Sequence, residues 1–243
     1  MDAIKTESIT KRYKELTAVD HLDLTVREGE LFGLLGVNGA GKTTLIKMLS
    51  CLAEPTEGDA CLLGYSIRKQ KNQLKPLLAV SPQETAVAPN LTVKENLNLL
   101  MGIHGFSKEK RAAKLNELTE GFGLSSVLGR KAGKLSGGWQ RRVSIALALV
   151  TEPKILFLDE PTLGLDVLAR SDLWDLIRVL KGKITIVLTT HYMEEAEALS
   201  DRVGMMKDGK LLAIGTPEEL KKSVGTDKFE EAFIKIVKGG VQR

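Results

Sequence analysis

The chain has 243 residues, 43% of them hydrophobic, which is enough to bury a substantial core and excludes a disordered protein. Its 35 basic and 31 acidic residues leave a net charge of +4 spread along the sequence, a balance that does not require nucleic acid as a partner. The longest apolar runs fall far short of the roughly 20 residues that cross a bilayer, and the first residues lack the pattern of a secretion signal, so we expect a soluble chain on the cytoplasmic side.

The first part of the chain predicts a strand, a glycine-bearing loop and a helix. Short strand-like stretches open the sequence, and Glu28-Gly29 predicts a turn before the apolar run 31–35. A stripe of apolar side chains from Leu45 to Leu52 then predicts an amphipathic helix that ends at Pro55.

The middle of the chain, residues 84–150, predicts an inserted set of helices without strands. Thr92 and Glu95 have the spacing of a capping box at a helix start, and Ser107 is expected to cap the next helix. A basic cluster in this stretch is expected to form a solvated helix face; its members are Lys108, Lys110, Arg111 and Lys114.

The last part returns to strands. Residues 155–158 and 184–188 are short apolar runs typical of buried parallel strands, and Asp208-Gly209 predicts a hairpin turn. Thr216, followed by proline and glutamate, predicts a capped helix, and the turn-rich residues from 225 onward are expected to form a short extension. Cys51 and Cys61 match neither a zinc site nor a disulfide framework, so both are expected to be buried.

Residues 36–43, Gly-Val-Asn-Gly-Ala-Gly-Lys-Thr, match the phosphate-loop pattern between a strand and a helix. The glycines allow backbone N–H groups to point inward, and the helix start adds positive potential, which suits a polyphosphate. We expect Lys42 to reach the outer phosphates and the Thr43 hydroxyl to bind Mg²⁺. The predicted nucleotide-binding residues of this segment are Asn38, Gly39, Gly41, Lys42, Thr43 and Thr44. On its own, the loop fits a GTPase, a nucleotide kinase or a helicase equally well.

Asp159 and Glu160 directly follow a predicted buried strand, at the edge where open α/β sheets bind ligands. We expect Asp159 to hold Mg²⁺ and Glu160 to act as the general base for the water that attacks the terminal phosphate. The long gap between Lys42 and Asp159 contains the helical stretch and is atypical of compact GTPases.

A second glycine motif precedes the acidic strand end. Ser136, Gly137 and Gly138 lie before a helical stretch, and a hydroxyl with two glycines at a helix start can receive a phosphate. In isolation this motif would be an ordinary turn and cap, but in this position it resembles the signature motif of the ATP-binding cassette (ABC) ATPases. Trp139, where the family often has glutamine, is not expected to contact nucleotide.

The resemblance covers nearly the whole chain and implies roles for four more residues. Gln83 matches the family's glutamine loop, which contacts Mg²⁺ and the attacking water. Tyr13 is similar to the aromatic residue that stacks on adenine, and Asp166 to the loop that crosses to a partner subunit. His191 resembles the switch histidine that senses the terminal phosphate. Each has an ordinary alternative: a surface loop residue, a strand-edge aromatic, a helix cap and a packed histidine.

The family resemblance implies an α/β P-loop NTPase with a mixed sheet core, an N-terminal antiparallel β subdomain and an inserted helical subdomain. We expect the ATPase domain to span residues 1–224, with the helical subdomain at about 84–150 and a short extension at 225–243. Val37 and Val167 stand where the family often has proline, without altering the phosphate-binding residues.

The resemblance also implies the function. Two ABC ATPase subunits, alike or unlike, would pair head to tail around ATP and Mg²⁺, and hydrolysis would open the pair to drive separate membrane-spanning permease subunits at the cytoplasmic face of the membrane. The run from Thr189 to Glu197 looks most like that of export systems. An alternative is a soluble ABC ATPase that remodels a ribosome or nucleic-acid complex, and another is a non-hydrolysing regulator, which conflicts with the presence of Glu160.

Overall fold

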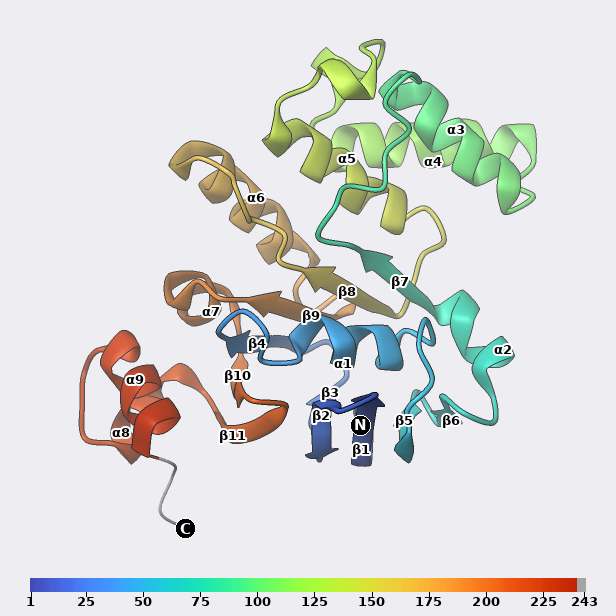
Figure 1. The fold of residues 1–243 in the computed structure, drawn as a ribbon. Helices are drawn as coiled ribbons and strands as arrows, with labels where there is room; N and C mark the ends of the chain where they lie inside the picture. Colours follow the sequence, from blue (N-terminus) through green and yellow to red (C-terminus); the bar gives the residue numbers. More distant parts are fainter. Residues whose placement is uncertain (240–243) are drawn as a thin grey trace.

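The computed structural model describes residues 1–239, which form two β-sheets and a group of helices (Figure 1). The strands are β1 (Asp2–Tyr13), β2 (Leu16–Leu22), β3 (Thr25–Arg27), β4 (Leu31–Gly36), β5 (Glu57–Leu62), β6 (Tyr65–Ser66), β7 (Leu78–Ser81), β8 (Ile155–Asp159), β9 (Thr185–Thr190), β10 (Arg202–Lys207) and β11 (Lys210–Gly215). The α-helices are α1 (Lys42–Leu49), α2 (Lys71–Leu74), α3 (Val93–Ile103), α4 (Lys108–Gly121), α5 (Gly137–Ala148), α6 (Val167–Leu180), α7 (Met193–Leu199), α8 (Pro217–Ser223) and α9 (Phe229–Gly239). Short 3-10 turns lie at η1 (Lys75–Leu77), η2 (Ser125–Val127) and η3 (Ala132–Lys134).

The larger sheet has six strands in the order β11-β10-β4-β9-β8-β7. Strands β10, β4, β9, β8 and β7 run parallel, while β11 pairs antiparallel with β10 through the predicted hairpin. Every residue of β4, β8 and β9 is buried, because helices and the second sheet cover both faces, and this explains their continuous apolar sequences. The carboxyl ends of β4, β8 and β9 therefore meet at one edge.

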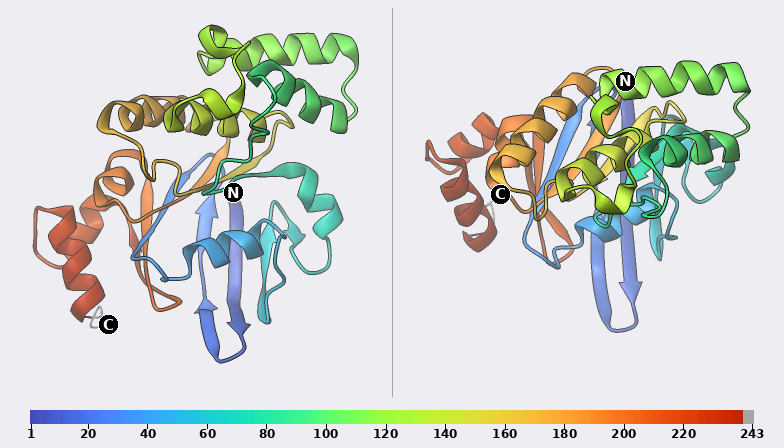
Figure 2. Two further views of the ribbon diagram at one scale, coloured as in Figure 1. Left: turned by 45° about the horizontal axis from the view of Figure 1, so that its top comes forward. Right: turned by 90° about the horizontal axis from the view of Figure 1, so that it is seen from above.

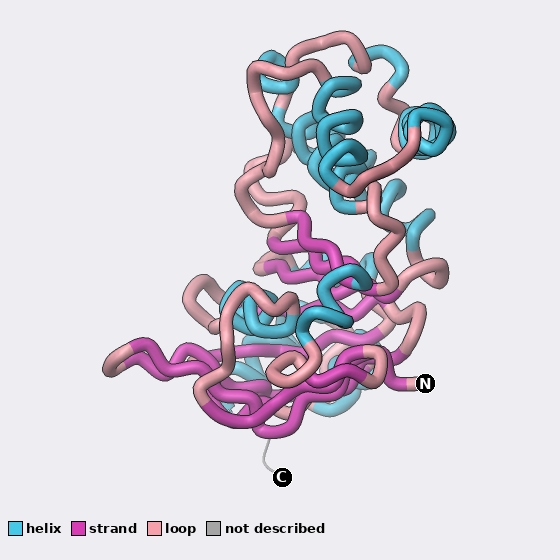
Figure 3. The backbone as a smooth tube through the Cα atoms, turned by 90° about the vertical axis from the view of Figure 1, so that its right-hand side faces the viewer, coloured by secondary structure: helices cyan, strands magenta, loops and turns pink. Residues whose placement is uncertain are grey.

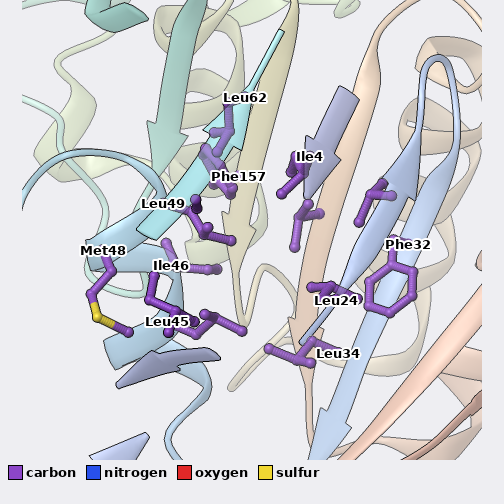
Figure 4. Close-up of a cluster of buried hydrophobic side chains, with 14 of the residues drawn as sticks. Ile4, Leu24, Phe32, Leu34, Leu45, Ile46, Met48, Leu49, Leu62 and Phe157 are labelled. Carbon is purple, nitrogen blue, oxygen red and sulfur yellow. The ribbon is translucent and has the colours of Figure 1, made fainter. Parts of the chain in front are cut away.

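The second sheet has the order β2-β1-β5-β6, with β3 also paired to β1, and all of its pairings are antiparallel. Side chains of both sheets and of α1 share one buried core (Figure 4). In this core Ile4 of β1, Phe32 of β4, Leu49 of α1 and Phe157 of β8 are fully buried. The six-stranded mixed sheet, together with the N-terminal antiparallel sheet, confirms the predicted fold class.

Helices α3, α4 and α5 form a lobe between β7 and β8 that stands away from the strands (Figures 2 and 3). The lobe has a core of its own, in which Leu97, Leu118 and Val143 are buried, and this core continues onto β8 and β9. No helix in residues 1–239 is long and apolar enough to cross a membrane.

The predicted caps and turn are confirmed. Thr92 and Thr216 each form a capping box with the glutamate three residues later, and Ser107 accepts a hydrogen bond from the backbone of Lys110. The hairpin between β10 and β11 turns at Asp208 and Gly209, whose φ angles of 49° and 78° are those of a primed turn.

Four details differ from the predictions. Helix α1 ends at Leu49, so Leu52 lies outside it and is 69% exposed. Cys51 is partly exposed and Cys61 is exposed, because Cys61 points outward on β5 in a sheet that is buried on one face. Lys114 is buried, since Glu117 and Glu152 bind its ammonium group.

The fourth difference concerns the end of the chain. Most of the described residues after 225 belong to helix α9 (Phe229–Gly239), where the sequence predicts a turn-rich extension. Phe229, Phe233 and Ile236 on this helix are buried against β10 and α7, so α9 belongs to the packed fold. Residues 240–243 lie outside the described part of the chain.

Candidate functional site

The loop between β4 and α1 accommodates only glycine at two positions. Gly41 has a φ of 100°, and a Cβ there would lie 2.2 Å from the carbonyl oxygen of Ala18. Gly36 leaves β4 so close to β10 that a Cβ would lie 2.5 Å from the carbonyl oxygen of Met206. Glycine therefore lets the loop curl tightly at the N-terminus of α1, where helix N–H groups favour an anion.

Lys42 lies inside this loop. Its Nζ donates to the carbonyl oxygens of Gly36 at 2.7 Å and Val37 at 3.2 Å, and it lies 3.3 Å from Oε1 of Glu160. The side chain is 5% exposed, so its charge is little screened by solvent. The ammonium group thus joins the phosphate loop to the end of β8.

Asp159, at the end of β8, faces two hydroxyl groups. Its Oδ1 accepts hydrogen bonds from Thr43 of α1 at 3.1 Å and from Thr189 of β9 at 2.6 Å. A carboxylate beside a threonine hydroxyl is a hard oxygen donor set of the kind that Mg²⁺ takes. The residues present therefore fit Mg²⁺.

Glu160 follows with an unusual backbone, at a φ of 45°. This conformation is held by Thr189, whose carbonyl oxygen and hydroxyl both accept the Glu160 N–H, at 3.1 and 3.0 Å. The Oε2 atom lies 3.0 Å from Nδ1 of His191, which follows β9. Glu160 is thus held between Lys42 and His191 at the edge of the sheet.

These groups line one cavity of about 570 Å³. The predicted residues that line it are Asn38, Gly39, Gly41, Lys42, Thr43, Thr44, Gln83, Glu160 and His191. Asp159 lies beneath it, bonded to Thr43. Sequence reasoning missed Thr189, although its place at the end of a buried strand directly before Thr190-His191 was a usable signal. It also missed the wall formed by Ala18 and Gly209, which comes from pairing of distant segments.

Besides Asp159, five predicted residues do not line this cavity. Tyr13 is 45% exposed, and the Nζ atom of Lys11 lies over its ring, 5.1 Å from the ring centroid. Asp166 is exposed and caps α6 by accepting a hydrogen bond from the Ala169 N–H at 2.9 Å. The remaining three begin α5 in the helical lobe; they are Ser136, Gly137 and Gly138.

The start of α5 is close to the start of α6. A Cβ on Gly138 would lie 2.9 Å from the Cβ of Ala169, and one on Gly137 would lie 3.6 Å from the side chain of Leu165. Ser136 and Gly137 are exposed, and the Ser136 hydroxyl makes no capping hydrogen bond. The hydroxyl and the first N–H groups of α5 therefore face solvent together, outside the cavity of their own chain.

A buried carboxyl supports the segment that follows Glu160. Glu195 of α7 accepts hydrogen bonds from the Thr162 hydroxyl at 2.9 Å and from Trp174 Nε1 at 3.1 Å. Its Oε2 atom has no hydrogen-bond partner in the described structure. Burial raises the pKa of Glu195 above its ordinary value, more than the neighbouring donors and Arg170 lower it.

The phosphate loop, the acidic strand end and the parallel sheet define a P-loop nucleoside triphosphatase. The family model described as ABC transporter matches residues 19–163, and the chain belongs to this family. This confirms the resemblance found in the sequence. By this membership the chain is an ATP-binding cassette.

Three curated relatives are similar over most of this chain. The probable multidrug ABC transporter ATP-binding protein YbhF of Escherichia coli K12 is 38% identical over 96% of this chain, which spans only 41% of YbhF. The daunorubicin/doxorubicin resistance ATP-binding protein DrrA of Streptomyces peucetius is 40% identical, with 93% of this chain and 68% of DrrA covered. The Nod factor export ATP-binding protein I of Burkholderia orbicola is 41% identical, with coverage of 93% and 75%.

Solved structures agree in fold. An ATP-binding subunit of an ABC transporter has a TM-score of 0.84 and 28% identity, with 96% of this chain and 99% of that chain covered. The cassette MJ0796, solved as a dimer in a post-hydrolysis state with ADP and Pi, has a TM-score of 0.79 and 28% identity, with coverage of 88% and 98%.

Proposed function

We propose that this chain is the ATP-hydrolysing subunit of an export-type ABC transporter and that ATP-driven pairing with a second cassette supplies the motion. The observation that carries the proposal is the separation of two phosphate-binding elements. The cavity at Lys42 holds one, and the solvent-facing start of α5 at Ser136 is the other. A second subunit can bring its own Ser136 to this cavity, and the dimeric MJ0796 structure is similar to this chain.

The chemistry follows from the edge of the sheet. Lys42 and the loop N–H groups bind the outer phosphates of ATP, and Tyr13 stacks on the base. Thr43, Gln83 and Asp159 would hold Mg²⁺, which neutralises phosphate charge when bound. Glu160 accepts a proton from the attacking water, and its position between Lys42 and His191 orients the carboxylate.

A second observation favours pairing on this face. Val167 and Leu168 follow Asp166 at the start of α6 and are 77% and 78% exposed. Large apolar side chains exposed together beside a polar site are typical of an interface. The second cassette, a copy of this chain or an unlike one, would cover them together with Ser136, Gly137 and Gly138.

The membrane partner is proposed to dock on the other side of the helical lobe. A groove of about 390 Å³ lies between β7 and the lobe and is lined by Leu78, Leu100 and Phe106 among others. On the adjoining helix α3, Leu99 and Ile103 are 51% and 70% exposed. This apolar surface suits a cytoplasmic helix of a separate permease subunit, which would hold the chain at the cytoplasmic face of the membrane.

The names of the relatives support export. They describe drug resistance and Nod factor export, whereas none of the three describes a ribosome or a nucleic acid. We therefore prefer a transporter subunit to a soluble remodelling ATPase.

Replacement of the proposed base tests pairing. Glu160→Gln should abolish most hydrolysis and accumulate a dimer with Mg²⁺ and ATP, seen by light scattering after gel filtration. The same variant without nucleotide, and Glu160→Gln combined with Lys42→Ala, should remain monomeric. A Glu160→Gln protein that stays monomeric with bound ATP, or that hydrolyses ATP at the wild-type rate, contradicts the proposal.

A further inference from the structure

Arg141 is a buried cation that the proposed chemistry does not use. It lies in the second turn of α5, shortly after Ser136, and is 4% exposed. Its guanidinium group donates through Nη1 to the carbonyl oxygen of Pro82 and through Nη2 to that of Gln83. The side chain therefore reaches from the helical lobe to the segment that follows β7.

The surroundings of Arg141 suit a positioning role. In residues 1–239 it forms no ion pair with a carboxylate, so the two carbonyl oxygens are its direct partners. Asp159 and Glu195 lie near enough to favour its charge, although burial lowers its pKa. A buried charge is costly unless its donors are satisfied, and a planar guanidinium can bind two acceptors in fixed directions. Arg141 thus fixes the relative positions of α5 and this backbone segment.

Gln83 depends on this contact. Within the described chain, the bond from Arg141 is the one hydrogen bond that Gln83 makes. Gln83 is exposed and lines the phosphate cavity, so its side chain has little packing to hold it. The hydroxyls of Ser144 on α5 and Ser81 on β7 form a hydrogen bond of 3.1 Å, one turn further along the helix, which does not involve Gln83.

We propose that Arg141 is a positioning residue for Gln83, which couples the place of the signature helix to the place of the glutamine in the ATP site of the same chain. A shift of the α5 start, caused by nucleotide at Ser136, would move Gln83 through the hydrogen bonds that Arg141 donates to Gln83 and to the preceding Pro82. The inference rests on the proposed function of both motifs. It assigns to one side chain a link between the two ATP sites of a pair.

A double-mutant cycle on ATP hydrolysis tests this link. The variants are Arg141→Met, Gln83→Ala and their combination, and Ser144→Ala is the control at the same interface. Arg141→Met should lower kcat roughly 10-fold or more, as small misplacements do, while KM for ATP stays within about twofold. In the Gln83→Ala background the same change should lower kcat less than about twofold, because coupled residues are not additive. Ser144→Ala should change kcat less than about twofold in either background.

Arg141→Lys keeps the charge and can reach one carbonyl oxygen, so its kcat should lie between those of wild type and Arg141→Met. If Arg141→Met does not fold, Arg141→Lys replaces it in the double-mutant cycle. Melting temperatures of all variants separate unfolding from mispositioning. If Gln83→Ala lowers kcat, but Arg141→Met lowers kcat by the same factor with and without Gln83→Ala, the positioning role of Arg141 is overturned and the role of Gln83 stands. A Gln83→Ala enzyme with wild-type kcat overturns the proposed role of Gln83 and the positioning role together.

Discussion

The hydroxyl of Thr189 lies 2.6 Å from Oδ1 of Asp159, on the neighbouring strand at the same register. The same hydroxyl accepts the backbone N–H of Glu160 at 3.0 Å. One buried side chain therefore orients the residue proposed to hold Mg²⁺ and fixes the strained backbone of the proposed base. The geometry of both acids therefore depends on a residue that does not line the cavity itself.

Thr189→Val keeps the shape of the side chain and removes this hydroxyl. We expect kcat for ATP hydrolysis to fall roughly 10- to 100-fold, because both acids lose their orientation. Stability should fall by about 1–2 kcal/mol, since a buried N–H loses one acceptor. Steady-state kinetics and urea unfolding measure the two effects.

Thr185→Val is the matched control for this change. Thr185 is buried on the same strand, and its hydroxyl accepts a hydrogen bond from the Gly29 N–H at 3.0 Å, far from the site. This variant should lose similar stability and keep its kcat within about twofold. If both variants lose activity equally, Thr189 acts on the strand as a whole and not on the acids.

The sequence predicts the local parts of this fold well, because their causes are local. The capping boxes at Thr92 and Thr216 are made by hydrogen bonds within three residues of the chain. The turn at Asp208 and Gly209 requires only positive φ angles, which an Asp-Gly pair adopts readily. The phosphate loop and the acidic strand end are predicted for the same reason. Their meeting in one cavity follows from the parallel order of β4, β9 and β8.

Features that depend on distant partners were not predictable from one sequence. Lys114 has the sequence of a solvated helix face, and it is buried because Glu152, far along the chain, reaches it. The helix at Phe229 is stable because β10 and α7 supply its core. The proposed role of Arg141 depends likewise on the carbonyl oxygens of Pro82 and Gln83, which the segment after β7 presents. Contacts of this kind require the tertiary fold.

Glu195→Gln should change how stability depends on pH. Burial raises the pKa of Glu195 above 4.5 in the folded state, and its neighbours are Thr162, Trp174, Thr190 and Arg170. The folded state then holds this proton to higher pH than the unfolded chain does, so the wild type loses stability as pH rises from about 4.5 through the folded pKa. Glutamine does not titrate and can still accept from Trp174.

The stability of Glu195→Gln relative to wild type should therefore increase between pH 5 and pH 8, measured by urea unfolding. The adjacent Glu194 is largely exposed, and Glu194→Gln is the control. The difference in unfolding free energy between Glu194→Gln and wild type should stay constant over this pH range. A wild type that gains stability relative to Glu195→Gln as pH rises would show that the carboxylate form is favoured in the fold.

Gly138→Ala tests the close approach of α5 and α6. The new Cβ would meet the Cβ of Ala169 at 2.9 Å, so the helix start must shift, at a cost of about 1–3 kcal/mol. ATP-dependent pairing of a Glu160→Gln background should weaken, because the shifted helix misplaces Ser136. Adding Ala169→Gly should restore both the melting temperature and the pairing.

The matched control is Gly121→Ala, at the end of α4, where a Cβ meets nothing within 4 Å. Its stability should stay level or rise by about 0.5–1 kcal/mol. Failure of Ala169→Gly to rescue pairing would mean that Gly138 is needed for a contact outside its own chain and not for this packing.

Ile103→Asp tests the proposed docking surface separately from ATP chemistry. Ile103 is 70% exposed on α3, so a charge there should change stability by no more than about 0.5 kcal/mol. Hydrolysis by the isolated chain should stay at the wild-type rate, because the cavity at Lys42 is on the other lobe.

Recovery of membrane subunits with a tagged chain from detergent-solubilised membranes should fall, since a carboxylate cannot enter an apolar contact without losing its hydration. Val179→Asp, at a 60% exposed position on α6, should recover the wild-type amount. Equal recovery with both variants would place the membrane contact elsewhere on the chain.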